Sequence, residues 1–531
     1  MNKLAVLFIC AAAAVTARAQ TFANVASFNG TDGANPWYIP LVQATDGNLY
    51  GTTGGGGANQ FGTIFSVTPT GTLGTLYNFR STDGAYPVSA LIQGSDGNFY
   101  GTTQQGGSSG WGTVFKVTPA GVLTTMHAFN STDGAYPYAG LVQANNGTFY
   151  GTTEIGGYKN NGTVFALTSS GKLTTLHKFN PQIGLDGTSP YGALIQGADG
   201  NLYGTTGYGG ANGYGTIFKM AETGSLTILY SFQSADGHNP FAGLVQGTDG
   251  NFYGTTLYGG AFGYGTVFQL NPSGTLTTLH SFAQTDGAYP YAGLVQATDG
   301  KFYGTTQQGG ANNRGTLFQI TTTGVLDTLY SLAATDGAYP LGGLAEATSG
   351  LLYGSTFLGG ADSEGTIFSL ANGIAPFIKT APTAADVGNS VSILGTNLTG
   401  ATSVTFNGTA ATFTVTSPSQ VSTTVPTGAT TGIVQVATPS GNLATSGVFQ
   451  VKPQVGTFSP TSGPVGTSVT IKGQTLTGAT GVTFGGVAAT TFIVNSNSQI
   501  SAVVPSGAVS GKIGVTTPGG SAQSKNTFTV N

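Results

Sequence analysis

The tetrapeptide Tyr-Gly-Thr-Thr recurs at an almost constant step along most of the chain. Copies begin at Tyr50, Tyr100, Tyr150, Tyr203, Tyr253 and Tyr303, and a variant copy with Ser in the third place begins at Tyr353. Successive copies are 50 residues apart, with one step of 53. A fixed step of this size indicates an array of equivalent units, each of which buries its apolar face against its neighbours.

Each unit of the array is predicted to form four short strands. In the unit that follows Pro290, strands are expected over 291–298, 302–306, 315–321 and 325–332, with an Asp-Gly hairpin turn at 299–300. The composition agrees, because charged residues make up only 6% of the chain while Thr, Val, Phe and Tyr are plentiful. Four strands in about 50 residues are typical of a β-propeller blade.

The two ends of the array predict a closed ring. The seventh unit stops after a third strand at 365–370, whereas 21–28 precedes the first unit and matches the fourth-strand pattern of 276–282. Moving that strand to the last unit completes seven blades and removes the open sheet edges. The Asp-Gly hairpins then share one face of the ring. The Gly-rich loops and the Asp-Gly-Ala-Tyr-Pro connections share the other.

The repeated pattern Leu-Val-Gln-Ala-Thr-Asp-Gly-Asn-x-Tyr-Gly-Thr-Thr, followed by Gly-Gly and then Gly-Thr-Val-Phe, resembles a known repeat. It is similar to the GloVer tandem repeat of bacterial secreted and surface proteins, and the resemblance covers about residues 22–371. This resemblance implies export and, often, an attached C-terminal module. It implies no known activity.

After Gly373 the pattern changes to two units of about 78 residues, each with alternating short strands and Gly/Pro turns. Such units are typical of β-sandwiches. The stretches 459–466, 473–476 and 482–486 resemble an IPT/TIG immunoglobulin-like domain, and the first unit keeps the equivalents 395–398 and 404–408. That resemblance implies a spacer or adhesion module. The predicted domains are a signal peptide (1–19), an all-β seven-bladed propeller (20–373) and two sandwiches (374–451 and 452–531).

The first 19 residues are interpreted as a secretory signal: Lys3, an apolar run from Leu4 to Val15, and Ala17-Arg18-Ala19 before Gln20. The run is too short for a stable membrane span. Removing it also removes Cys10, so disulfides, thiolate nucleophiles and Cys-metal sites are not expected. It leaves 13 basic against 19 acidic side chains, without a basic patch, which makes nucleic acid a poor partner. The chain is expected to be secreted or attached to the cell surface.

One Asp stands in every connection between units, and the set allows two interpretations. Seven carboxylates around one mouth could bind Ca²⁺ or sugar hydroxyls; alternatively, each Asp caps its own turn. Repetition in every blade favours turn capping, and no metal or cofactor is expected. The seven residues are Asp32, Asp83, Asp133, Asp186, Asp236, Asp286 and Asp336.

Aromatic residues on the loop face are either packing between blades or binding groups, because Tyr and Trp can stack on sugar faces or anchor a protein partner. Beside the Asp series stand Trp37, Tyr86, Tyr136, Tyr191, Phe241, Tyr289, Tyr291 and Tyr339. Loop tips add Phe61, Trp111, Tyr158, Tyr208, Tyr214, Tyr258 and Phe262. The predicted ligand-binding set is Trp37, Phe61, Trp111, Tyr158, Tyr214, Phe262 and Arg314.

Three functions are compatible with these features. The favoured hypothesis is a secreted or cell-surface binding or adhesion protein that presents its loop face to an extracellular glycan or a surface protein. An alternative is a polysaccharide-active lyase or hydrolase that uses Glu154, His238 or Glu364, the ionisable groups that break the symmetry of the repeats. The third is a structural component of an envelope or matrix. The sequence leaves the ligand and the oligomeric state open.

Overall fold

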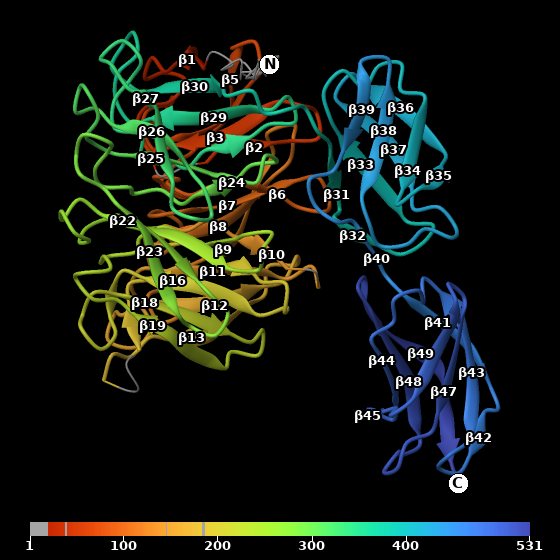
Figure 1. Ribbon diagram of the computed structural model, residues 1–531. Helices are drawn as coiled ribbons and strands as arrows, with labels where there is room; N and C mark the ends of the chain where they lie inside the picture. The colour runs from red at the N-terminus through yellow and green to blue at the C-terminus, as the bar shows by residue number, and fades with distance from the viewer. Residues whose placement is uncertain (1–19, 38–39, 145, 183–185) are drawn as a thin grey trace, which may run out of the picture.

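The computed structural model describes residues 20–37, 40–144, 146–182 and 186–531, and these residues form strands and loops without a helix (Figure 1). The predicted signal peptide lies outside the described residues. No described segment forms a helix of the length and apolarity that a bilayer crossing requires. Seven four-stranded antiparallel sheets form a ring, and two smaller β-sandwiches follow it (Figure 1). The fold is therefore a seven-bladed β-propeller followed by two immunoglobulin-like sandwiches.

Within each blade the strands follow one another from the centre of the ring outward. The innermost strands are β2 (Val42–Gln43), β6 (Ile92–Gln93), β10 (Val142–Gln143), β15 (Ile195–Gln196), β20 (Val245–Gln246), β24 (Val295–Gln296) and β28 (Ala345–Glu346). The second strands are β3 (Leu49–Thr53), β7 (Phe99–Thr103), β11 (Phe149–Thr153), β16 (Leu202–Thr206), β21 (Phe252–Thr256), β25 (Phe302–Thr306) and β29 (Leu351–Thr356).

The outer half of each blade is equally regular. The third strands are β4 (Thr63–Val67), β8 (Thr113–Val117), β12 (Thr163–Leu167), β18 (Thr216–Met220), β22 (Thr266–Leu270), β26 (Thr316–Ile320) and β30 (Thr366–Ala371). The outermost strands are β5 (Leu73–Asn78), β9 (Leu123–Ala128), β13 (Leu173–Lys178), β19 (Leu226–Ser231), β23 (Leu276–Ser281), β27 (Leu326–Ser331) and β1 (Thr21–Ser27). A further short pair joins β14 (Gly187–Thr188) to β17 (Tyr208–Gly209).

The ring is closed by the N-terminal strand, as predicted. Strand β1 is the outermost strand of the seventh blade and pairs antiparallel with β30, from Thr21 opposite Ala371 to Ser27 opposite Thr366. The last blade is thus built from both ends of the array, and no blade lacks its fourth strand. The prediction for the innermost strands was too long: β24 covers two residues of the expected 291–298, because residues 291–294 line the centre of the ring instead.

Tyr-Gly-Thr-Thr forms the second strand of each blade and joins that blade to the next. In four blades the Tyr ring packs against the Phe that begins the neighbouring second strand; the centroids of Tyr253 and Phe302, for example, are 4.0 Å apart. The Gly permits close approach, since a Cβ on Gly51 would lie 2.6 Å from the ring of Phe65. Apolar clusters accordingly lie between blades, and the one that contains Phe28 and Leu41 joins the seventh blade to the first.

The connections between blades carry a repeated backbone hydrogen bond on the loop face. The N–H of Tyr86 donates to the carbonyl of Phe61, and that of Tyr136 to the carbonyl of Trp111, each over 3.0 Å. The equivalent donors in the other blades are Asn35, Ser189, Asn239, Tyr289 and Tyr339. All seven donors have positive φ, near 55°, an uncommon conformation for residues other than Gly that the repeated bond holds in place.

The two sandwiches share one strand order. In the first, one sheet is β31-β33-β37-β36 and the other β35-β34-β38-β39; in the second, they are β41-β43-β47-β46 and β42-β49-β48-β44-β45. The first uses β31 (Lys379–Ala381), β32 (Ala384–Ala385), β33 (Ser390–Leu394), β34 (Ser403–Phe406), β35 (Thr409–Ala411), β36 (Phe413–Ser417), β37 (Gln420–Thr424), β38 (Val434–Thr438), β39 (Gly441–Ala444) and β40 (Gln450–Val451). The second uses β41 (Gln454–Ser459), β42 (Ser462–Gly463), β43 (Ser468–Gln474), β44 (Gly481–Phe484), β45 (Val487–Ala488), β46 (Phe492–Ser496), β47 (Gln499–Val503), β48 (Gly511–Thr517) and β49 (Gly520–Val530).

The first sandwich contacts the hairpin face of the propeller. The Ser419 hydroxyl donates to the carbonyl of Asp46 over 2.9 Å, and the hydroxyls of Thr348 and Thr396 lie 3.0 Å apart. The Lys379 ammonium donates to the carbonyl of Glu346 over 2.6 Å. The loop face of the propeller, on the opposite side, is left uncovered by these contacts.

Candidate functional site

The seven Asp residues in the connections cap their own turns. Each carboxylate accepts the N–H of a residue at the start of its turn; the Asp83 carboxylate, for instance, accepts from Arg80 N over 2.9 Å. The other donors are the N–H groups of Asn29, Asn130, Asn180, Gln233, Ala283 and Ala333. His127 and Tyr330, on outermost strands, also bond to their Asp. These contacts support the turn-capping interpretation.

The Asp residues of the hairpins are likewise structural. Asp46, Asp96, Asp199, Asp249 and Asp299 each accept a hydrogen bond from the Tyr of Tyr-Gly-Thr-Thr in the same blade, over 2.7–2.9 Å. Burial alone would raise the pKa of Asp199, but hydrogen bonds from Lys219, Asn201 and Tyr203 outweigh it and lower the pKa to about 2. Within the described ranges no group of three His, Cys, Asp or Glu side chains is placed to hold a metal ion.

The predicted ligand-binding residues separate into three kinds. Phe61, Trp111, Tyr214 and Arg314 occupy the position whose carbonyl accepts the hydrogen bond between blades, and the first three also pack on the next connection. Tyr158 and Phe262, at loop tips, are 41% and 61% exposed. Trp37 differs from all of these, because it directly follows the Pro of its connection, and its ring lies 5.3 Å from that of Phe357.

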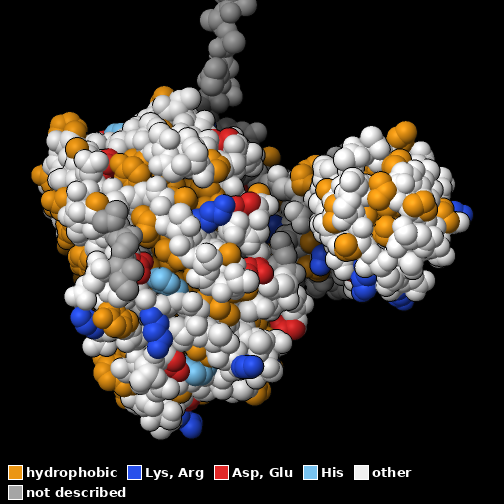
Figure 2. All heavy atoms as spheres, turned by 90° about the horizontal axis from the view of Figure 1, so that it is seen from below, with side chains coloured by type: hydrophobic (Ala, Val, Ile, Leu, Met, Phe, Trp, Pro, Cys, Tyr) orange, Lys and Arg blue, Asp and Glu red, His pale blue; other side chains and the backbone are white. Residues whose placement is uncertain are grey.

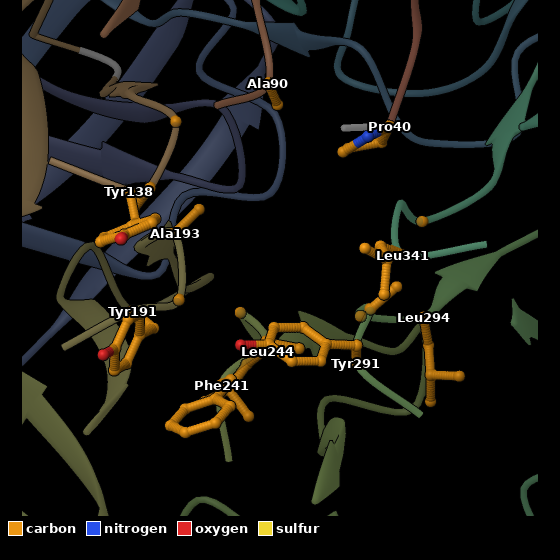
Figure 3. A pocket seen from close by; sticks show the side chains of 18 of the residues that line it. Pro40, Ala90, Tyr138, Tyr191, Ala193, Phe241, Leu244, Tyr291, Leu294 and Leu341 are labelled. Carbon is orange, nitrogen blue, oxygen red and sulfur yellow. The ribbon is translucent and has the colours of Figure 1, made fainter. Parts of the chain in front are cut away.

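The propeller encloses a cavity of about 210 Å³ on its axis. All seven blades contribute to its wall, which is mainly Gly, Ala and Leu from the segments that lead into the innermost strands. In Figure 3 the labelled residues surround the opening in blade order, with Pro40, Ala90 and Leu341 on one side and the aromatic residues on the other. The channel is thus narrow and apolar, with an asymmetric mouth.

The asymmetry comes from an arc of four aromatic rings, each from a different blade. They are Tyr138, Tyr191, Phe241 and Tyr291, and each directly follows the Pro of its connection. Ring centroids along the arc are 5.3, 4.6 and 5.5 Å apart, in tilted or edge-on contacts (Figure 3). We call this set the aromatic arc. Figure 3 shows its rings following one another around half of the opening.

A carboxylate joins the middle of the aromatic arc. Oε1 of Glu154 accepts a hydrogen bond of 2.5 Å from the hydroxyl of Tyr191. Burial raises the pKa of the Glu154 carboxyl, while the Tyr191 hydrogen bond acts in the opposite direction. The pKa of the Tyr191 hydroxyl is raised too, chiefly by burial and then by Glu154. One blade earlier, the direction is reversed: the Gln104 amide nitrogen donates a hydrogen bond to the Tyr138 hydroxyl.

Of the three residues suggested for an enzyme, Glu154 lies at the channel mouth. His238 stacks between Tyr214 and Tyr258, with centroids 5.1 and 5.5 Å away, and its Nδ1 contacts Oδ1 of Asn239. Glu364 lies beside Gly30, a residue that follows the outermost strand β1 in the sequence. The structure therefore places the three groups in separate surroundings rather than in one constellation.

The sequence analysis did not single out Tyr138 or Gln104, and it treated Tyr191, Phe241 and Tyr291 as members of a larger set. A signal was present in the sequence. The residue after the connection Pro and the residue after Tyr-Gly-Thr-Thr in the previous blade vary between repeats, and these two positions meet at the mouth. Examples are the pairs Gln104–Tyr138, Glu154–Tyr191 and Phe357–Trp37.

Comparison with known families agrees with the repeat architecture. The family model described as the Gloeobacter/Verrucomicrobia repeat matches residues 12–197 and 190–416, which together are most of the chain. The chain belongs to this family. The two matched spans together cover the propeller and continue into the first sandwich. The IPT/TIG domain model matches residues 453–530, the second sandwich, whose strand order the first sandwich shares. No relative was found among curated proteins.

Several solved structures are similar at low identity. A fungal alcohol oxidase of the AA5 family, in complex with copper, is 13% identical, with 79% of this chain and 98% of that one covered and a TM-score of 0.45. A gluconolactonase from Xanthomonas campestris is 12% identical over 53% of this chain and 86% of that one, with a TM-score of 0.36. A surface glycan-binding protein from Prevotella bryantii is 18% identical over 29% of this chain and 39% of that one, with a TM-score of 0.22.

Proposed function

We propose that this protein binds glycans, and that its binding site is the mouth of the propeller channel. The observation that carries the proposal is the aromatic arc with Glu154 hydrogen-bonded at its centre. Four rings of neighbouring blades contribute to one side of a concave apolar site, and polar groups stand at fixed points among them. A small number of placed polar groups in a largely apolar hollow is the usual composition of a ligand site.

The chemistry of the site matches that of a sugar. A pyranose ring has apolar C–H faces, which stack on aromatic rings, and a rim of hydroxyls, which need hydrogen-bond partners. The aromatic arc offers the stacking surface, while Glu154 and Gln104 offer an acceptor and an amide. Charged residues make up only 6% of the chain. Figure 2, which views the propeller from the side and not onto the mouth, shows its charged side chains spread singly or in small groups. So low a charge favours a neutral ligand over an acidic one.

The expected location is the cell exterior or cell surface, on the strength of the signal-like residues 1–19. In this proposal the propeller, predicted over 20–373, is the binding module. The sandwiches, predicted over 374–451 and 452–531, act as a spacer on the opposite face. The loop face is then free to meet a glycan while the sandwiches make a second contact. A purely structural role in an envelope would not require an aromatic channel mouth.

The test is titration calorimetry of the full mature chain with a panel of neutral oligosaccharides. Phe241→Ala and Glu154→Ala should each weaken binding about 10-fold, because the first removes a stacking ring and the second removes a hydrogen-bond acceptor. Tyr158→Ala, an exposed loop-tip residue of the third blade, is the matched control and should bind normally. Absence of binding to every neutral glycan would reject the proposal. Release of new reducing ends or unsaturated products would favour the enzyme alternative, with Glu154 as its first candidate.

A further inference from the structure

Aromatic rings continue outward from the channel mouth across the loop face of the fourth to sixth blades. Tyr208 is the connecting residue, because its ring lies 5.8 Å from that of Phe241 in the aromatic arc. Tyr258 holds the equivalent position in the next blade, directly after the first residue that follows Tyr-Gly-Thr-Thr. Tyr258 also contributes, after burial, to the raised pKa of the Tyr208 hydroxyl. We call the outer set the outer track. Its members are Tyr208, Tyr258, His238, Tyr214, Tyr289 and Tyr264.

Ring contacts join five members of the outer track around Tyr258. The Tyr258 ring lies 5.5 Å from His238 and 5.4 Å from Tyr289. From these, the track extends to Tyr214, 5.1 Å beyond His238, and to Tyr264, 5.8 Å beyond Tyr289. Each step is comparable with the steps of 4.6–5.5 Å within the aromatic arc. The loop face therefore carries a chain of ring contacts around Tyr258, beside the Tyr208 ring that contacts the aromatic arc.

The propeller does not need the rings of Tyr208 and Tyr258 for its own packing, although Tyr264 also packs against the core between the blades. Tyr208 and Tyr258 stand in the second place after Tyr-Gly-Thr-Thr, where the other blades have no aromatic residue. Those blades carry Gly55, Gln105, Ile155, Gln308 and Leu358. The backbone pairing at this position is nevertheless the same, as Ala288 with Gln308 and His238 with Tyr258 illustrate.

The exposure of these side chains also indicates that they are not required for packing. Tyr208 and Tyr258 are 45% and 41% exposed, and Tyr214 is 38% exposed. The hydrogen bond between blades at Tyr214 and Tyr264 uses their carbonyl groups, so it needs neither ring. A connected set of half-exposed rings that the scaffold can dispense with marks a binding surface.

The chemistry of the outer track specifies a neutral, hydroxyl-rich occupant. Five of its six rings are phenols, which combine a stacking face with a hydrogen-bonding edge, and the sixth is the imidazole of His238. The Trp, Phe, Met and Arg that accompany Tyr in protein interfaces are not among its members. Sugars, with apolar faces and polar rims, fit this surface better than a protein helix or strand does.

We propose that the ligand is an extended neutral glycan, with one end or branch in the channel mouth and its following sugar units laid along the outer track. This inference rests on the proposed function, since it assumes that the mouth is a glycan site. It adds that affinity grows with chain length, because each further sugar unit finds another ring. A monosaccharide or disaccharide would engage the aromatic arc alone.

The experiment compares a disaccharide with a hexasaccharide from each of the cello-, xylo-, malto- and laminari-oligosaccharide series, by calorimetry on the full mature chain. In at least one series, the hexasaccharide should bind at least about 10-fold more tightly than the disaccharide. Tyr208→Ala and Tyr258→Ala should remove that gain and leave disaccharide affinity unchanged, whereas Phe241→Ala should weaken both. Gln308→Ala, at the equivalent position of the sixth blade, is the matched control, and Tyr258→Phe should retain the gain because it keeps the ring.

The outcomes separate the two proposals. One outcome would overturn the extended track and leave the mouth site standing. In it, short and long oligosaccharides bind with equal affinity, Tyr208→Ala and Tyr258→Ala do not change that affinity, and Phe241→Ala lowers it. Absence of binding in all four series would overturn both. A purified protein ligand whose binding is lost in Tyr208→Ala and Tyr258→Ala, without any glycan binding, would reassign the track to a protein interface.

Discussion

The hydroxyl of Tyr191, in the fourth blade, donates a 2.5 Å hydrogen bond to Oε1 of Glu154, in the third. The same Tyr191 ring lies 4.6 Å from Phe241 and 5.3 Å from Tyr138. One side chain therefore belongs both to the stacking surface and to the polar centre of the mouth. Any ligand that stacks on this part of the arc is brought next to a carboxyl group whose protonation depends on its burial.

The Glu154→Gln variant should gain stability relative to the wild-type protein as the pH rises. Burial raises the folded-state pKa of Glu154 above its ordinary value of 4.5, so the folded state holds this proton at pH values where the unfolded state has lost it. The wild-type protein therefore loses stability as the pH rises from about 4.5 through the folded-state pKa, and Gln removes that loss. Melting temperatures of both proteins over a pH series measure the difference. An unchanging gap would show that the carboxyl has an ordinary pKa; Asp362→Asn, on an exposed loop, is the control.

Tyr253→Phe should destabilise the propeller more than Tyr353→Phe. The Tyr253 hydroxyl donates to the Asp249 carboxylate over 2.7 Å, whereas the hairpin of the seventh blade has Ser349 in place of Asp. Loss of a hydrogen bond to a charged acceptor costs about 1.5 kcal/mol. For a domain of this size that lowers the melting temperature by roughly 2 °C. Equal effects of the two substitutions would show that the Tyr–Asp bond contributes little.

Phe22→Ala should weaken the closure of the ring. The Phe22 ring on β1 stacks on Tyr330 of the preceding blade, with centroids 4.3 Å apart and planes within 1°, and it also lies 5.3 Å from Phe368. Its removal should cost about 2 kcal/mol, less than for a fully buried Phe. Hydrogen exchange of β30 amides should then accelerate before that of other blades. Val122→Ala, at a side chain 63% exposed, provides the control; unchanged exchange in β30 would contradict the expectation.

Lys379→Met should loosen the first sandwich from the propeller. The ammonium group bonds to the Glu346 carbonyl over 2.6 Å and lies beside the Phe377 ring, and burial lowers its pKa. Met keeps the length of the side chain but leaves that carbonyl without its donor and the Glu346 carboxyl without a nearby cation, at a cost of about 1–3 kcal/mol. Small-angle scattering should show a larger maximum dimension and a broader distance distribution. Lys472→Met, on the exposed surface of the second sandwich, should leave the profile unchanged; an identical profile for Lys379→Met would reject the expectation.

The architecture could be predicted from the sequence because the repeats agree with one another. Seven copies of one strand pattern, with a missing last strand and an extra first strand, allow few arrangements other than a closed ring. The turn-capping role of Asp83 and its equivalents followed from the same regularity. The innermost strands were overestimated, since an apolar run such as 291–298 does not show which residues pair and which line a channel.

The candidate site could not be predicted in the same way, because it is built from residues of different repeats. Gln104 and Tyr138 are far apart in the sequence and meet only when neighbouring blades pack side by side. Phe61 and Trp111 were interpreted as ligand-binding loop residues, yet their carbonyls hold the next connection in place. Sequence variation between repeats identified the loop face but not which variable positions share one opening.

The sequence by itself determined the number of blades, the strand that closes the ring and the composition of each face, since these depend on periodic patterns within one unit. Tyr-Gly-Thr-Thr was expected to supply packing, close approach and strand propensity. Tertiary structure added that its first Thr bonds to the backbone of the next blade, as Thr255 does to Ala292 over 2.9 Å. Only the tertiary structure decided where the arc, Glu154 and the outer track come together, because the ring places equivalent positions of successive repeats side by side around one axis.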